Sequence, residues 1–449
     1  MTRGPFNTVA DNRVLATLGY MFAKLTPNTN KLKKYRNLLI AAHSLNQASA
    51  KTENNPILIR VAPISICNYR CLFCEIHKDN VMYPNRPCNA IDMNDVNNFE
   101  SFLSTAKNLE LYGGSAEPLL NPDLKKILAY LKSKYGTRMM VNTNASVLTK
   151  EYADLFVKYG FDYILVSYHA GTKDKYHELS TTGDIDNVNN NLQYLAERKL
   201  EAGKKKPFIE FNFALQKENA TEATAVIDTA KRLNVSAVLI NKYYGGRNKL
   251  QDKMVSYDYD TKQGNEELDK IYQYADKLGV HLKPTTPSHW AEKNEKPDWN
   301  NENYKKNSTC PFPWLNLFFD PVLDEKDSFY VSVCNRIVLC KINYRKLKLS
   351  KRADFMTLWN HPVFQYLRST VNKEPLNPIC KYCKNCDREK MRNTDANEYA
   401  KIRDNAVKSF FAEYRRNHSP APVDGLEILD DNPFSDEKYL DKLNSQTTL

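Results

Sequence analysis

The sequence contains no apolar run long enough to span a bilayer, although hydrophobic residues make up 42% of its 449 positions. It also lacks the basic start, apolar stretch and small-residue cleavage site of a signal peptide, and it shows no internal repeat and no low-complexity tract. We therefore expect a cytoplasmic protein without a membrane partner, whose apolar residues fill the cores of two or three structural units.

Disulfides are a poor explanation for the ten cysteines, because disulfides are rare in the reducing cytoplasm. Nine of the ten lie in two groups, at 67–74 and at 310–386, and Cys88 stands alone. Grouped cysteines in a cytoplasmic chain indicate metal binding or catalysis. Both groups are therefore candidate metal sites.

Positive charge is concentrated near the N-terminus of a chain whose net charge is +11. Residues 1–60 hold nine Lys or Arg and two acidic residues, a net charge of +7 (nine minus two). Such a segment can attract nucleic acid, an acidic peptide or a phosphorylated substrate, or it can be only a solvated helix face. Apolar spacing predicts two helices within 10–47, separated at Thr26-Pro27-Asn28, so we expect residues 1–55 to form a basic helical extension.

Between 57 and 284 the sequence alternates short apolar strands with amphipathic helices, which is typical of a parallel sheet with helical crossovers. A complete eight-unit barrel needs roughly 250 residues, so six units favour a partial (β/α)6 TIM-like barrel, which we place at 56–290. The expected strands are Ile57–Ile66, Leu109–Tyr112, Met139–Asn142, Tyr163–Ser167, Phe208–Leu215 and Ala237–Asn241. The expected helices are Asn121–Tyr135, Lys150–Tyr159, Asp186–Arg198, Thr221–Leu233 and Glu266–Leu278.

The remainder of the chain is predicted as a linker, a small domain and a tail. Residues 285–309 are polar and favour a linker, and residues 310–390 hold six cysteines with little regular periodicity. The many cysteines and the weak periodicity of 310–390 predict a small iron–sulfur domain at 308–392 that is organised by metal more than by an apolar core. Residues 393–449 are expected to form a charged helix and a partly disordered tail.

The first cysteine group, Cys67, Cys71 and Cys74, has the spacing C-x3-C-x2-C directly after the first expected strand. In α/β barrels the loops at the carboxyl ends of the strands carry the active site. A four-iron cluster normally takes four cysteines, so three would leave one iron with an open coordination position. A zinc site completed by a fourth ligand such as His77 is the alternative.

This segment resembles the hallmark of the radical S-adenosylmethionine (SAM) superfamily, in which C-x3-C-x-aromatic-C follows the first strand, and Phe73 is the aromatic residue here. The resemblance implies that the three cysteines hold a [4Fe-4S] cluster whose open iron chelates SAM, and that Phe73 lies near the adenine. An electron from the cluster would cleave SAM to a 5′-deoxyadenosyl radical, which abstracts hydrogen from a substrate. The resemblance also implies an external one-electron reductant such as flavodoxin or ferredoxin.

The segment after the second strand resembles a SAM-binding motif of the same superfamily. Gly113 and Gly114 allow a tight turn and a close approach of the backbone to a ligand. The carboxylate of Glu117 is suited to accept a hydrogen bond from an ammonium group. Together the three residues resemble the Gly-Gly-Glu motif, which implies that they contact SAM and that Glu117 binds its amino group.

The ends of the third and fourth strands supply further candidates. Asn142 and Asn144 lie where the superfamily often has Ser/Thr-Asn-Gly, which makes them candidate SAM contacts, although Ala145 replaces the glycine. Ser167 resembles a serine that points into the barrel. His169 follows the same strand and is a candidate catalytic base or substrate contact, while a hydrogen-bonded loop residue is the alternative.

The second cysteine group resembles the Twitch or SPASM-type extension that follows many radical SAM barrels. By that match, a second, auxiliary [4Fe-4S] cluster has as ligands Cys310, Cys334, Cys380 and Cys383. Cys340 and Cys386 are additional, and either one can replace a predicted ligand. A zinc ribbon is the alternative for this region, because four thiolates suit zinc as well.

The sequence therefore predicts a radical SAM enzyme that abstracts hydrogen from a peptide or a sugar-like small molecule. The resemblance favours oxidation, cross-linking or epimerisation of that substrate. No winged-helix domain for binding a leader peptide is evident at the N-terminus, which weakens the case for a peptide. We expect no nucleic-acid partner, and a zinc-stabilised nucleic-acid-binding protein, which the basic residues 1–60 would favour, is the alternative.

Overall fold

The computed structural model describes residues 12–26, 32–74, 88–112, 116–242, 262–284, 310–321, 325–334, 337–343, 345–347, 349, 351–373, 377–381 and 396–431. The chain forms two compact units. The terminal unit contains Met1–Val61, Asp92–Leu109 and Glu302–Leu449, and the barrel unit contains Ala62–Ile91 and Glu110–Asn301. The domain boundaries expected from the sequence stay predictions.

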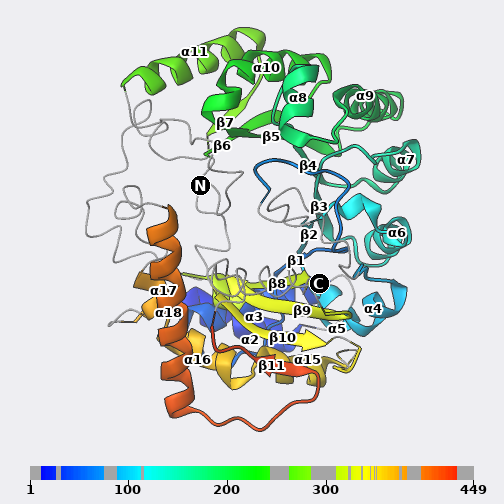
Figure 1. Ribbon diagram of the computed structural model, residues 1–449. Coiled ribbons are helices and arrows are strands. Elements are labelled where there is room, and N and C mark those ends of the chain that lie inside the picture. Colours follow the sequence, from blue (N-terminus) through cyan, green and yellow to red (C-terminus); the bar gives the residue numbers. More distant parts are fainter. Residues whose placement is uncertain are drawn as a thin grey trace, which may run out of the picture. The chain divides into compact units, whose positions relative to one another are not determined.

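The barrel unit is built on parallel strands that follow one another in chain order (Figure 1). Register pairs such as Thr143 with Val166, and Ser167 with Asn212, bring the carboxyl ends of neighbouring strands to one edge. The strands are β3 (Arg138–Thr143), β4 (Tyr163–Ser167), β5 (Phe208–Leu215), β6 (Ala237–Lys242) and β7 (Leu282–Pro284). β2 (Asn108–Leu111) contains the boundary between the two units.

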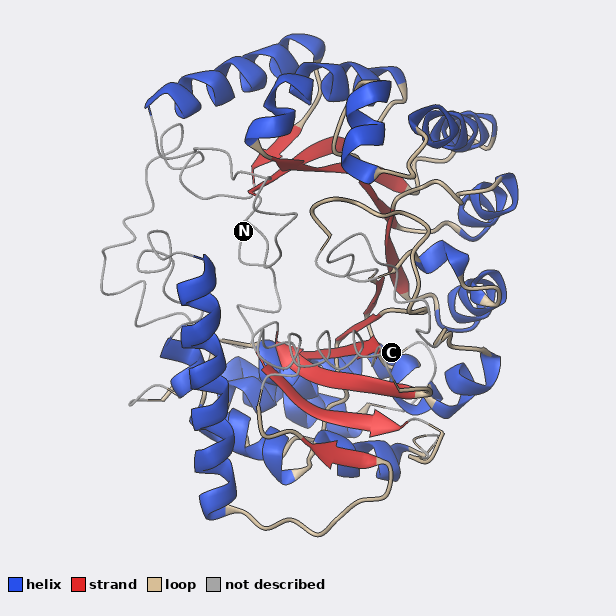
Figure 2. Ribbon diagram, in the orientation of Figure 1, coloured by secondary structure: helices blue, strands red, loops and turns tan. Residues whose placement is uncertain are grey.

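Helices alternate with these strands and lie on the outer side of the sheet (Figures 1 and 2). They bury apolar stripes at helical spacing, and two of them end at Gly136 and Gly160, whose positive φ values favour glycine. The helices are α6 (Leu124–Tyr135), α7 (Lys150–Tyr159), α8 (Lys173–Ser180), α9 (Ile185–Glu201), α10 (Ala223–Arg232) and α11 (Lys262–Leu278), with 3-10 turns η2 (Pro118–Leu120) and η3 (Lys217–Glu222). The predicted partial α/β barrel is confirmed, while β7 and α8 were not predicted.

An ionic network connects the amino ends of β3, β4 and β5, at the edge of the sheet opposite the carboxyl ends of these strands. The buried carboxylate of Asp162 accepts hydrogen bonds from Lys132 Nζ, from Lys206 Nζ at 2.6 Å and from the Met139 N–H at 3.0 Å. Burial raises the pKa of Asp162, but the hydrogen bonds from the two lysines and the N–H outweigh it and leave the pKa lowered. The ionised carboxylate therefore connects three consecutive strand starts.

The terminal unit combines one parallel strand pair with antiparallel strands. β1 (Leu58–Val61) pairs in parallel with β8 (Asn316–Pro321), and β8, β9 (Ser328–Cys334), β10 (Ile337–Asn343) and β11 (Leu426–Ile428) pair in antiparallel order. The first strand ends well before the predicted Ile66, because Pro63 has no N–H for a sheet ladder.

The helices of the terminal unit come from three separate parts of the chain, and they are α2 (Arg13–Leu25), α3 (Lys33–Asn46), α4 (Met93–Asn98), α5 (Glu100–Leu103), α14 (Phe312–Leu315), α15 (Arg352–Trp359), α16 (Pro362–Thr370), α17 (Pro378–Lys381) and α18 (Ala396–Asn417). The predicted helical N-terminal extension is present as α2 and α3. In the described residues, no helix is long and apolar enough to cross a membrane.

An extensive apolar core underlies the region that we expected to be organised by metal more than by an apolar core, so the sequence underestimates that core. Phe102 stacks on Phe319 and Phe355 with ring centroids 6.0 and 4.3 Å apart, and Phe99 stacks on Phe319 at 5.8 Å. Phe329 packs edge-on against Phe319. The partners of Phe99 and Phe102 lie more than 200 residues further along the chain, so local periodicity does not reveal this part of the core.

Candidate active site

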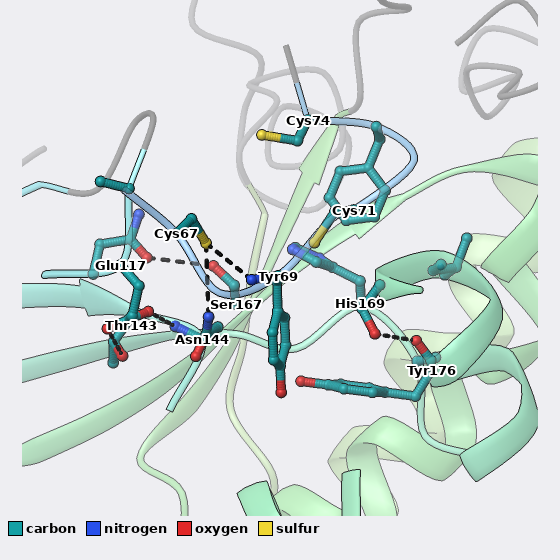
Figure 3. Close-up of a pocket in the computed structure, with 16 residues that line it drawn as sticks. Cys67, Tyr69, Cys71, Cys74, Glu117, Thr143, Asn144, Ser167, His169 and Tyr176 are labelled. Atoms are coloured by element: carbon teal, nitrogen blue, oxygen red, sulfur yellow. Dashed lines mark hydrogen bonds between the residues drawn. The ribbon is translucent and has the colours of Figure 1, made fainter. Parts of the chain in front are cut away.

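One pocket of the barrel unit gathers the loops that follow β2, β3 and β4 and the cysteine loop 67–74. Figure 3 shows the cysteines on one side of this pocket, with Glu117, Asn144 and His169 around it. The pocket lies at the carboxyl ends of the strands, as expected for an α/β barrel. The predicted residues that line it are Cys67, Cys71, Phe73, Cys74, Glu117, Asn142, Asn144, Ser167 and His169.

The backbone of the cysteine loop is held by the end of α8 and the residues that follow it. The Leu72 N–H donates to the Leu179 carbonyl at 2.9 Å, and the Arg70 N–H donates to the Ser180 carbonyl at 3.3 Å. In return, Thr181 Oγ1 donates to the Arg70 carbonyl at 2.7 Å. These hydrogen bonds therefore help to set the shape of the loop. Sequence reasoning missed this support, although Tyr176 and Leu179, spaced i and i+3, carry a weak helical signal.

The three thiols suit a metal cluster in their chemistry. Cys67 Sγ accepts hydrogen bonds from the Tyr69 N–H at 3.4 Å and from Asn144 Nδ2 at 4.0 Å. Burial raises the pKa of Cys67 to about 12 and holds that of Cys71 well above its ordinary value. Buried thiols of this kind need nearby positive charge to ionise, which iron ions supply. Within the described residues, no three His, Cys, Asp or Glu side chains surround a single metal-ion position.

Glu117 is a buried carboxylate that joins the loop after β2 to the end of β3. Its side chain is 1% exposed. Oε1 accepts from Thr143 Oγ1 at 2.6 Å and from the Leu119 N–H at 3.1 Å, and Oε2 accepts from the Asn144 N–H at 2.7 Å. Burial raises the pKa of Glu117 to about 7, while these donors oppose the rise. A carboxylate has roughly four lone-pair positions, so one remains for a ligand.

Asn144 is chiefly a connector between β3 and the cysteine loop. Its Nδ2 donates to Asn68 Oδ1 at 3.0 Å, Asn68 Nδ2 donates to Ser146 Oγ at 2.8 Å, and Ser146 Oγ donates back to Asn144 Oδ1 at 2.7 Å. Ala145 has a φ of +59° in this turn, a left-handed conformation that favours glycine. With its amide committed to this ring of bonds, Asn144 positions the cysteine loop.

Asn142 and Ser167 lie side by side on β3 and β4. Ser167 Oγ donates to Asn142 Oδ1 at 3.4 Å. The N–H groups of the Asn142 amide take no part in this bond and can donate to other partners. Both residues line the pocket. They are therefore placed to contact a bound molecule, and their assignment as SAM contacts stays a prediction.

His169 packs against Phe73, with ring centroids 4.7 Å apart in an edge arrangement. Its Nδ1 accepts a hydrogen bond from the Ala214 N–H at 3.1 Å, so the neutral ring carries its proton on Nε2. Burial lowers the pKa of His169 to about 4. This geometry favours a neutral hydrogen-bond donor, and hence a ligand contact, over a general base.

Several predicted residues lie outside the described residues. They include Gly113 and Gly114 of the expected SAM-binding turn, and the candidate auxiliary ligands Cys383 and Cys386. Their roles stay predictions.

Two predicted auxiliary ligands share one apolar cluster of the terminal unit. Cys310 and Cys380 are half-buried and pack against Ala42, Leu45, Trp314 and Val371. Cys334, also half-buried, ends β9. By contrast, Cys340 is fully buried within β10, where burial raises the pKa of its thiol. The structure therefore favours Cys340 as a core side chain.

The segment that carries Cys310 is anchored by Asn372 and Arg368. Asn372 Oδ1 accepts from the Cys310 N–H at 2.8 Å, and its Nδ2 donates to the Cys310 carbonyl at 3.2 Å. The fully buried guanidinium of Arg368 donates to the Pro313 carbonyl at 2.9 Å and stacks on Trp359 at 4.4 Å. Cys310 therefore has a fixed backbone position before any metal binds.

Two curated relatives match about half of this chain. A Fe-coproporphyrin III synthase of Methanosarcina barkeri is 24% identical over 215 residues, which cover 47% of this chain and 50% of the relative. A probable GTP 3′,8-cyclase of Metallosphaera sedula is 26% identical over 235 residues, which cover 51% of this chain and 69% of the relative. This chain thus spans only half the length of the first relative.

A solved structure shares the fold over most of the chain. Streptococcus suis SuiB bound to S-adenosylmethionine matches with a TM-score of 0.52 and 15% identity, over 80% of this chain and 77% of SuiB. SuiB bound to its precursor peptide SuiA matches with a TM-score of 0.50 and 15% identity, over 79% and 78% of the two chains. At this identity the likeness concerns the fold.

A family model described as the radical SAM superfamily matches residues 61–209. That span contains the cysteine loop, Glu117, both asparagines, Ser167 and His169, all of which line the pocket. Enzymes of this superfamily use a [4Fe-4S] cluster and SAM. Residues 61–209 therefore match the radical SAM superfamily, and their cysteine motif lies in the pocket at the carboxyl ends of the strands.

Proposed function

We propose that the protein is a radical SAM enzyme that cleaves SAM reductively and abstracts hydrogen from a peptide substrate. The observation that carries the proposal is the meeting of three grouped thiols with a buried carboxylate in one pocket. We also propose that it acts in the cytoplasm and receives electrons from flavodoxin or ferredoxin.

Each pocket residue has a defined part in this proposal. Cys67, Cys71 and Cys74 would hold a four-iron cluster, which supplies the electron that splits SAM into methionine and a 5′-deoxyadenosyl radical. Glu117 offers its remaining acceptor position to the SAM ammonium group. Phe73 and the Nε2–H of His169 form one wall beside the bound nucleoside or substrate. The contacts at α8 keep the loop in place while ligands exchange.

A ribosomally made peptide is the substrate class that we favour, and a sugar-like metabolite is the second choice. SuiB, which shares the fold, has been solved with a precursor peptide. An auxiliary cluster in the terminal unit would accept an electron from the substrate or anchor it. The proposed outcomes are oxidation, cross-linking or epimerisation.

The direct test is an anaerobic assay of SAM cleavage. Reconstituted protein should be brown, contain iron and sulfide, and release 5′-deoxyadenosine when dithionite supplies electrons. Precursor peptides encoded beside the gene are the first substrates to test, and deuterium in the substrate should appear in the 5′-deoxyadenosine. A colourless zinc protein that releases no 5′-deoxyadenosine would contradict the proposal and favour a zinc-stabilised nucleic-acid-binding protein.

Replacement of Glu117 by glutamine is expected to weaken SAM binding. The change removes one charge-assisted hydrogen bond, on the order of 1.5–3 kcal/mol, so affinity should fall roughly tenfold to a hundredfold. Iron content should be unchanged, because Glu117 is not a proposed ligand. Equilibrium dialysis of SAM against the reconstituted variant measures the effect.

Glu222 provides a matched control for this variant. Its Oε2 also accepts three hydrogen bonds, from the Gly171 N–H at 3.0 Å and from the Thr172 N–H and Oγ1 at 2.8 Å each. It is not among the described residues that line the pocket. Glu222→Gln should therefore lower stability without lowering SAM affinity. Equal losses of SAM affinity in both variants would show that Glu117 acts only through the fold.

A further inference from the structure

Helix α2 presents a stripe of large apolar side chains to solvent. Ten large apolar side chains are exposed among the described residues, and eight of them belong to α2, to the start of α3 or to the residue before it. Those on α2 recur at helical spacing and form one continuous face. They are Val14 (67% exposed), Leu15 (42%), Leu18 (56%), Met21 (56%), Phe22 (65%) and Leu25 (85%).

The opposite side of α2 is the side that packs. Ala16 and Ala23 are fully buried, and a Cβ added at Gly19 would lie 3.2 Å from Leu39 Cδ2 of α3. Arg36 Nε of α3 donates to the Ala23 carbonyl at 2.8 Å. Small residues thus allow a close approach of the two helices. Beside this packing, the large apolar residues of α2 keep between 42% and 85% of their surface exposed.

The charge of this helix pair is of one sign. The two helices contain five Lys or Arg and no Asp or Glu. On α2, Arg13 and Lys24 lie together with Thr17 beside the apolar face, and Lys24 pairs with Glu53 outside the helix pair. Tyr35, 69% exposed, adds an amphipathic ring at the start of α3. An apolar face with cationic flanks is typical of helices that lie in a membrane interface.

We propose that helices α2 (Arg13–Leu25) and α3 (Lys33–Asn46) dock the protein on an anionic lipid surface, with the apolar face of α2 inserted among the acyl chains. The lysines and arginines would contact the lipid phosphates, which gather cations at the cytoplasmic leaflet. Such a contact is peripheral, and it is separate from the finding that no helix of the described residues is long and apolar enough to cross a membrane.

Two other occupants fit less well. A second copy would bring an equal set of five cations against the first, and Glu53, an acid that lies against α2, is already bonded to Lys24 and Tyr20. A protein partner for an exposed helix face needs a complementary groove, and it also needs acidic side chains placed opposite the individual lysines and arginines. A lipid surface needs neither, because it deforms around the helix and its negative charge is spread out.

The test is cosedimentation of the full-length, anaerobically prepared protein with lipid vesicles. It should bind phosphatidylcholine vesicles that contain phosphatidylglycerol, and binding should weaken as salt is raised. The double variant Leu18→Glu/Phe22→Glu should partition at least about tenfold less, because it places charge within the apolar face. Leu200→Glu is the matched control, because Leu200 is a still more exposed leucine (83%) that lies in α9, and its replacement should leave binding unchanged.

Three outcomes would overturn the proposal. The first is that the double variant binds vesicles as well as the wild type does. The second is that the wild type binds vesicles of pure phosphatidylcholine as well as those that contain phosphatidylglycerol. The third is that the wild type does not bind vesicles but forms a dimer, which light scattering shows to be a monomer in the double variant. Circular dichroism shows whether the double variant is folded, and the salt dependence of the wild type tests the charge contribution without any variant. Vesicle binding is measured without SAM, so the result is independent of catalytic activity.

Discussion

Replacement of Cys71 by alanine is expected to reduce reductive SAM cleavage to the background rate. Three cysteines are available to hold the proposed catalytic cluster, so none is spare. Cys71 lies within the loop that the end of α8 holds in place, so its removal should take away a ligand while the loop keeps its shape. The measurement is 5′-deoxyadenosine released under dithionite, with iron content determined on the same sample.

Cys88 supplies the matched control. It is exposed and belongs to neither cysteine group. Cys88→Ala should therefore keep both its iron content and its SAM cleavage. Full activity in Cys71→Ala would refute the assignment of this loop as the cluster site, and a loss of activity in both variants would point to a general effect of cysteine replacement.

A variant with alanine at Cys67, Cys71 and Cys74 is expected to keep about four irons, bound in the terminal unit. The proposed ligands Cys310 and Cys380 belong to that unit and pack against an apolar cluster that contains none of the replaced residues. Four protein ligands would close this auxiliary cluster to SAM. Its electron paramagnetic resonance signal should therefore remain in the triple variant and should not change when SAM is added.

The alternatives for the auxiliary site give different metal contents. An iron-free triple variant, or one that retains zinc, would refute the auxiliary cluster. Retention of roughly eight irons would require further ligands, such as Cys386. A Cys340→Ser variant should keep its cluster, because the Cys340 side chain is buried within the sheet.

The position of the site could be predicted because consecutive parallel strands place their carboxyl ends at one edge. This is why Glu117, Asn142 and Ser167, which are well separated in sequence, line one pocket with the cysteine loop. The hydrogen bonds inside the pocket could not be predicted. Only the fold reveals that Glu117 already accepts three hydrogen bonds and that Asn144 is bonded to Asn68.

The terminal unit was harder to predict because its contacts join distant segments. Phe99 and Phe102 complete a core with Phe319 and Phe355, and no local pattern connects these residues. The helical spacing of the large apolar residues of α2 could be seen in the sequence. That spacing does not tell which face of the helix packs against the protein. The small residues Ala16, Gly19 and Ala23 settle that question only when the partner helix is seen.

The support of the cysteine loop by α8 has a consequence for the order of biosynthesis. Thr181 and Thr182 bond to carbonyls 111 and 114 residues earlier in the chain. During translation the cysteines leave the ribosome long before these partners exist. The loop can reach its final geometry only after residue 182 has emerged and β4 has joined the sheet, so an iron–sulfur carrier that recognises this geometry would act on a chain in which β1 to β4 are already made.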